Sequence, residues 1–291
     1  MKLLHSRLRA TMLTFLLVAG FSLGAFTNAF ASLTILSHFL QSSPPPTLGG
    51  GGNLEDIFNV AAARWERAFS DVNDPWQVEI TYKWANLAPT FLGECSLEDQ
   101  GGTPHRIQSA EIDFNNLGSL PLFADPTPLD NSEYRTYTDY SQDLGGGTIN
   151  VGRLYTDPTG QARDRYDLLQ VAEHEIGHAL GLQNDNTEFQ RQIPGNTLEI
   201  TSPRPYAGTT LFVRAGHIDS LFLQTPLMVN ESFPGERRLI SGVDILANAQ
   251  LSSLNNPNLD PYAVPEPGAL ALLVGGLSGA LFALRCRLRA R

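Results

Sequence analysis

The chain has 291 residues, of which 42% are hydrophobic, 30 are acidic and 20 are basic. Seven basic residues lie near the two ends, so the segment from Ser32 to Pro267 carries 13 basic and 30 acidic side chains, a net charge of −17. Such an acidic surface repels phosphate backbones and excludes a nucleic-acid-binding function. The two cysteines, Cys95 and Cys286, are too few for a disulfide framework, and Cys95 has no neighbouring histidine that would indicate a nucleophile.

The N-terminus has the features of an export signal. An apolar run from Met12 to Ala25 follows three basic residues and leads to the small residues Ala29 and Ala31. This pattern predicts a signal peptide at 1–31, cleaved after Ala31 by signal peptidase. The alternative, a membrane anchor, is disfavoured because the apolar run is short for a membrane span.

Residues 32–52 are rich in proline and glycine and are predicted to form a flexible linker. The folded domain is then expected at 53–262. It begins with a helix capped by Asn53, whose apolar residues recur at helical spacing. Trp65 belongs to that apolar face and is predicted to lie in the core.

Three strands are predicted next, at Trp76–Trp84, Ala110–Phe114 and Thr148–Tyr155. With a further helix they indicate an α+β fold in which a twisted sheet packs on two helices. Thr148–Tyr155 is the candidate edge strand over an active cleft, where an extended peptide could add to the sheet. The alternative is an ordinary strand without substrate contact.

Four acidic residues in the middle of the chain raise the question of a calcium site. They are Asp125, Asp130, Asp139 and Asp143. Their density would allow Ca²⁺, but their spacing matches no calcium loop, which favours solvated acidic turns.

The segment from Val171 to Gly181 contains the strongest motif, His174-Glu175-Ile176-Gly177-His178. Histidines four residues apart lie on one helix face and can bind one zinc ion, and Glu175 lies beside them as a general base that then acts as an acid. Apolar residues flank the motif, so it is predicted on a buried helix of about four turns that starts at a cap, Asp164 or Asp167, and stops at Gly181. The alternative is two histidines on an ordinary polar helix face.

From His174 to Gly181 the sequence resembles the metzincin metallopeptidases, in which a glycine after the second histidine turns the chain towards a third histidine ligand. Asn184 occupies the usual third position here, which is a departure from the family, and the neighbouring Asp185 is an alternative ligand. His217, followed by Met228, is the favoured one because the pair resembles leishmanolysin-type metzincins. In these an insertion precedes the third histidine, and a methionine turn lies beneath the metal. The corresponding insertion here is about 182–216, and a strand is predicted within it at Thr209–Val213. A surface-loop role for His217 remains the alternative.

The resemblance implies a zincin-like fold with a smaller C-terminal subdomain. That subdomain is expected to end in a helix after Arg238, capped by Ser241 with Asp244 at the reciprocal position. Gly181 and Met228 are then structural residues near the site.

The C-terminus, 263–291, combines Pro265-Glu266-Pro267 with an apolar segment at about 268–284 and four arginines. It resembles the PEP-CTERM sorting signal of Gram-negative bacteria, which implies transient membrane insertion, processing by an exosortase, and an extracellular or cell-surface location. An uncleaved tail anchor is the alternative.

The residues and the resemblance together predict an exported zinc metalloendopeptidase acting on a protein or peptide substrate. His174, His178 and His217 would hold the metal and Glu175 would transfer protons. The alternative is a non-catalytic exported matrix or surface protein that keeps the fold and the metal, since position 184 lacks a histidine.

Overall fold

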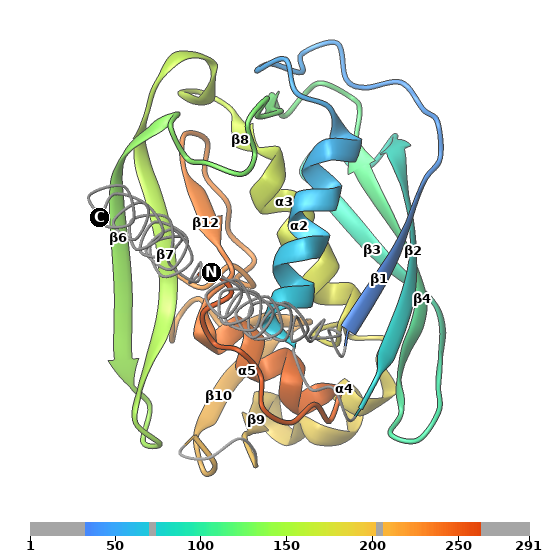
Figure 1. The fold of residues 1–291 in the computed structure, drawn as a ribbon, viewed down its shortest axis with the longest axis vertical. Helices are drawn as coiled ribbons and strands as arrows, with labels where there is room; N and C mark the ends of the chain where they lie inside the picture. The colour runs from blue at the N-terminus through green and yellow to red at the C-terminus, as the bar shows by residue number, and fades with distance from the viewer. Residues whose placement is uncertain (1–32, 70–73, 202–205, 263–291) are drawn as a thin grey trace, which may run out of the picture. The chain divides into compact units, whose positions relative to one another are not determined.

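The computed structural model describes residues 33–69, 74–201 and 206–262, which belong to one compact unit (Figure 1). The fold is a mixture of helices and several small sheets, as expected for an α+β protein. Within these ranges no helix is long and apolar enough to cross a membrane. The predicted signal peptide and sorting signal lie outside the described residues.

The main sheet has four strands in the order β1-β2-β4-β3. The first three, β1 (Leu33–Phe39), β2 (Trp76–Ala85) and β4 (Arg106–Asn115), run parallel, and β3 (Gly93–Gly101) pairs antiparallel with β4 at the edge. Alternate residues of β2, such as Val78 and Ile80, are fully buried. One face of this sheet therefore supplies a wall of the main core.

Two helices pack against that core and against each other, α2 (Leu54–Ala68) and α3 (Leu168–Ala179). Asn53 caps α2 as predicted, accepting a hydrogen bond from the backbone N–H of Asp56. Trp65 is fully buried, and its indole N–H donates to the backbone oxygen of Glu173 at 2.8 Å. The prediction of a core tryptophan is confirmed, and the same side chain ties α2 to α3.

The linker prediction for 32–52 is wrong. β1 lies within this segment, with Leu33 fully buried, and the glycine run forms backbone hydrogen bonds to Leu122 and Ala124. A side chain at Gly50 or Gly52 would collide with the backbone beside Ala124, so the glycines serve close backbone packing and not flexibility. Composition averaged over the segment concealed the alternation of Leu33 and Ile35.

A second sheet has the order β12-β7-β6, formed by β6 (Tyr134–Asp143), β7 (Thr148–Pro158) and β12 (Arg237–Leu239). β7 is its central strand, so the prediction that Thr148–Tyr155 is the edge over the cleft is wrong. The apolar alternation of β7 has another cause, because Ile149 and Val151 are buried in a core shared with the C-terminal helix. The edge strand of the main sheet, β3, packs against α3.

The predicted insertion forms a small structured unit whose apolar side chains belong to the same second core as those of β7 and the C-terminal helix. It contains α4 (Thr187–Gln192), β9 (Thr197–Glu199) and β10 (Thr210–Arg214), and β10 pairs with β11 (His217–Ile218). The predicted strand at 209–213 is thus confirmed as β10. The remaining short elements are β5 (Leu122–Phe123), β8 (Tyr166–Asp167) and two 3-10 turns at Gly160–Ala162 and Pro194–Asn196.

The C-terminal helix α5 (Gly242–Leu251) begins as predicted. Ser241 and Asp244 form a reciprocal capping box, which satisfies backbone N–H groups at the start of the helix. α5 packs against β7 and α4 and completes the second core.

Candidate metal centre

The start of α3 is held by a buried ionic network. Asp167, and not Asp164, caps the helix, accepting from the backbone N–H of Gln170 at 2.9 Å. The Asp167 carboxylate also binds Arg237 at 2.8 Å, and Arg237 binds Asp125 at 2.6 Å, with all three side chains buried. Removing one member would leave a buried charge without its partner, so this network fixes the position of the helix.

Further along, Arg64 of α2 binds Glu173 of α3 at 2.7 Å, again within the protein interior. The helix ends at Ala179, a little short of the predicted four turns, and Gly181 follows with a φ of 152°. A side chain at Gly181 would come within 3.1 Å of both Asn248 and Leu251, so the chain turns there in close contact with α5.

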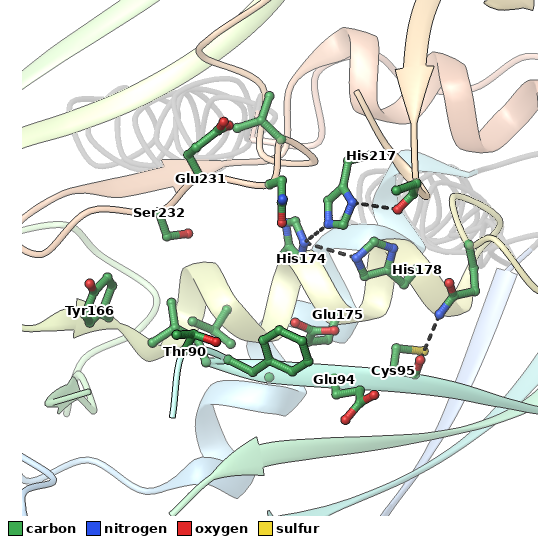
Figure 2. A pocket seen from close by; sticks show the side chains of 18 of the residues that line it. Thr90, Glu94, Cys95, Tyr166, His174, Glu175, His178, His217, Glu231 and Ser232 are labelled. Carbon is green, nitrogen blue, oxygen red and sulfur yellow. Dashed lines mark hydrogen bonds between the residues drawn. The ribbon is translucent and has the colours of Figure 1, made fainter. Parts of the chain in front are cut away.

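Three histidine rings converge at one point (Figure 2). His174 Nε2 lies 3.1 Å from His178 Nε2 and 3.3 Å from His217 Nε2. Among the described residues, these three histidines are the group of metal-ligating side chains whose ligand atoms all lie within 4.8 Å of one another. The structure thus brings His217 to the helix motif across the 38 residues that separate it from His178, whereas Asp185 is outside the cluster and the four aspartates do not form one.

In each ring a hydrogen bond from Nδ1 to a backbone carbonyl fixes the direction in which Nε2 points. Nδ1 of His174 bonds to the Leu227 carbonyl at 2.9 Å, Nδ1 of His217 to the Ala215 carbonyl at 2.9 Å, and Nδ1 of His178 to the Leu182 carbonyl. Because a carbonyl only accepts, each Nδ1 carries the proton and each Nε2 presents a lone pair. Three lone pairs facing one another repel, and a cation between them removes the repulsion.

The rings are held in the neutral form that binds a metal. Burial lowers the pKa of His178 to about 3, with a contribution from His217. Burial likewise lowers the pKa of His174 well below its ordinary value and that of His217 less strongly. Two nitrogens at about 2.05 Å from a tetrahedral zinc ion are about 3.3 Å apart, which fits the observed nitrogen separations. The donor set therefore fits zinc, with a fourth position free.

The third histidine, His217, is positioned by a tight hairpin. Arg214 of β10 pairs with His217 of β11, and the two residues between them, Ala215 and Gly216, have φ values of 50° and 78°. Both values lie in the left-handed region that a type I′ hairpin turn requires. The Ala215 carbonyl in this turn is the one that orients His217.

Met228 is fully buried beneath α3. A side chain at Gly177 would collide with its sulfur, so a glycine inside the motif lets the methionine turn approach the helix. Asp244 of α5 accepts hydrogen bonds from the backbone N–H groups of Leu227 and Met228, both at 3.0 Å. The Leu227 carbonyl in turn accepts from His174, so α5 is linked to the His174 ring through two successive hydrogen bonds.

Glu175 lies beside the histidines with only 6% of its surface exposed. Burial, reinforced by the negative charge of Glu94, raises its pKa to about 8. Its carboxylate forms no hydrogen bond with any residue that the structure describes, and it lines the cleft. A buried carboxyl without a partner is costly, which is typical of a functional group whose partner is a ligand or water.

These residues open into a cleft of about 600 Å³. Its lining includes the three histidines, Glu175, the start of β3 and the aromatic residues Phe91 and Phe233, and no lysine or arginine among the described residues. Cys95 is buried at its wall, and burial, followed by the charge of Glu175, raises the pKa of its thiol well above the ordinary value. It is therefore a thiol and not a reactive thiolate at neutral pH.

Comparison with protein family models, curated proteins and solved structures finds no match for this chain. The site is thus described by its own geometry. Sequence reasoning missed β3 and Gly93, because the strand has a polar, exposed composition without apolar alternation. It also missed the second role of Asp244, which only the position of the methionine turn reveals.

Proposed function

We propose that the protein is a zinc-dependent metalloendopeptidase. The observation that carries the proposal is the convergence of three neutral imidazoles beside a buried carboxyl without a hydrogen-bond partner, at the wall of an open cleft. A catalytic zinc site needs three protein ligands and a free position, and this arrangement supplies both. The resemblance to leishmanolysin-type metzincins agrees with a third histidine supplied after an insertion.

Glu175 is the group that would transfer protons. Burial raises the pKa of its carboxyl above the ordinary value, and its place beside the histidines suits a group that takes up and releases a proton. Zinc bound to His174, His178 and His217 would lower the pKa of its water and polarise the scissile carbonyl. Glu175 would take a proton from the attacking water and return it to the leaving amine.

The edge of β3 that faces away from β4, next to Glu175, is suited to bind an extended peptide. The Leu92 carbonyl bonds to Asn115 on the sheet side, whereas the Cys95 carbonyl accepts from the side chain of Gln183 on the opposite side. The backbone N–H and C=O groups of successive residues alternate in direction along an antiparallel strand. The N–H and C=O groups of Gly93 and Cys95 therefore point away from β4, towards the cleft. A substrate strand added there would pass directly over Glu175.

The proposed location of the protein rests on the sorting segments predicted at its two ends. The signal peptide at 1–31 and the PEP-CTERM-like segment with Pro265, Glu266 and Pro267 favour export, exosortase processing and an extracellular or cell-surface site of action. Calcium has no support from the aspartate arrangement: Asp125 is engaged with Arg237, Asp130 and Asp143 bond to residues nearby in the chain, and Asp139 accepts from Asn150.

The decisive variant is Glu175→Gln, tested in the full chain with an unstructured protein such as casein as substrate. We expect hydrolysis to fall about 100- to 10,000-fold, the range of general acid–base catalysis, while elemental analysis still finds one zinc per chain. Unchanged hydrolysis, or none in the parent, would contradict an enzymatic role and favour a non-catalytic metal-binding protein of the surface or matrix.

A second pair of variants tests the ligand set. His217→Ala should abolish stoichiometric zinc binding, and Asp185→Ala should retain it, because only the histidine lies in the cluster. The reverse result would assign Asp185 as the third ligand and overturn the proposed site.

A further inference from the structure

A second cavity of about 290 Å³ adjoins the cleft. The two share Asn184, Asp185 and Ala215 in their linings, so the smaller cavity lies directly beside the cleft. Ligand sites that hold whole small molecules measure about 300 to 1,000 Å³. At about 290 Å³ and next to the cleft, the smaller cavity is suited to one side chain of a substrate that lies in the cleft.

The walls of this cavity combine apolar and polar groups. Phe189, Ile193 and Val213 supply apolar surface, and Gln190, Asn196 and Asn184 supply amides. Such walls suit a side chain with a long apolar stem and a polar tip. Lysine and arginine have this character.

Asp185 supplies a negative charge at the junction of the two cavities. Its carboxylate forms no ion pair or hydrogen bond with the described residues, and among these no lysine or arginine lines either cavity. Its backbone is held in place on both sides: Gln100 donates to the Asp185 carbonyl at 2.9 Å, and Asn186 both caps α4 and donates to the Gly181 carbonyl at 2.8 Å. The unpaired charge is thus presented by a fixed loop.

We propose that this cavity is a substrate subsite for a lysine or arginine side chain and that Asp185 determines its specificity. The inference rests on the proposed peptidase function. A peptide that adds antiparallel to β3 runs with its N-terminal part towards the strand's C-terminal end, where Gln100 holds the Asp185 loop. The cationic residue is therefore N-terminal to the scissile bond.

The test uses the full zinc-loaded chain and two peptide series that differ at one position, carrying arginine, lysine, glutamine or norleucine on the N-terminal or the C-terminal side of the scissile bond. We expect the parent to favour the cationic peptides on the N-terminal side. Asp185→Asn should lower kcat/KM for these about tenfold and leave the norleucine peptide unchanged, since one charge-assisted hydrogen bond is lost. Asp164→Asn is the matched control, an exposed carboxylate that lines neither cavity, and should change nothing.

Binding of the same peptides to Glu175→Gln, measured by fluorescence anisotropy, separates the two proposals. Cleavage without a charge preference, or with one that Asp185→Asn leaves intact, overturns the subsite and keeps the peptidase. Absence of cleavage together with Asp185-dependent binding of cationic peptides supports the subsite and overturns the peptidase. Neither cleavage nor binding overturns both.

Discussion

Gly93 shows how closely the edge strand approaches the proposed general base. A Cβ atom added at this position would lie 2.8 Å from both Cγ and Oε1 of Glu175, closer than real Cβ atoms approach their neighbours. Because the contact is with a side chain and not with backbone, the added methyl group would move the Glu175 carboxyl and leave the fold intact.

Gly93→Ala should therefore lower kcat about 10- to 100-fold, the cost of misplacing a reacting group by about 1 Å, while zinc binding stays stoichiometric. Steady-state kinetics and elemental analysis measure the two effects. Gly101→Ala, at the other end of β3, is the control, because its Cβ would meet only Gln108 at 3.5 Å. Equal activity of the two variants would show that Glu175 does not act from the observed position.

Among the larger elements, α5 helps to position the candidate metal centre without contributing a side chain to the histidine cluster. The buried Asp244 carboxylate accepts from the backbone of Leu227 and Met228, and Leu227 orients His174. Groups that orient metal ligands in this way change metal affinity about 10- to 100-fold when they are altered. Asp244 is thus a positioning residue for His174.

Asp244→Asn keeps the shape of the side chain but loses the charge and one acceptor. We expect zinc affinity, measured by competition with a chelating dye, to fall about 10- to 100-fold, and stability to fall by about 1 to 3 kcal/mol. Ser241→Ala, which weakens the same cap without touching the methionine turn directly, should reduce stability and leave zinc affinity near that of the parent. If both variants lose affinity equally, general loosening of α5 explains the effect and positioning does not.

The sequence predicts those helices and strands whose periodicity or cap lies within the element itself. The helix around Trp65, the strands β2, β4, β7 and β10 and the capping box at Ser241 were all expected, because each has its own periodicity or cap. β3 and the packed glycines near Gly50 were not, because their order depends on partners far along the chain. For the same reason the pairing of His174 with His178 follows from helix geometry, whereas the arrival of His217 depends on a hairpin that local propensity does not specify.

Across the whole described part of the chain, the three histidines link the two hydrophobic cores. α3 belongs chiefly to the main core, with Leu169 and Ile176, while the hairpin that carries His217 packs on the second core through Val213 and Ile218. A metal that binds the folded state alone stabilises it according to its occupancy, by about 4 kcal/mol at a thousand times its dissociation constant. A bound zinc ion would therefore hold the two cores together.

Removing the metal should consequently lower the melting temperature by roughly 8 to 16 °C, given about 2 to 4 °C per kcal/mol for a domain of this size. Differential scanning calorimetry with and without a chelator measures this difference, and added zinc should restore the parent value. In His217→Ala the chelator should have no effect, because the link between the helix and the hairpin is already broken. A chelator-dependent shift that persists in this variant would place the stabilising ion at other ligands and contradict the three-histidine site.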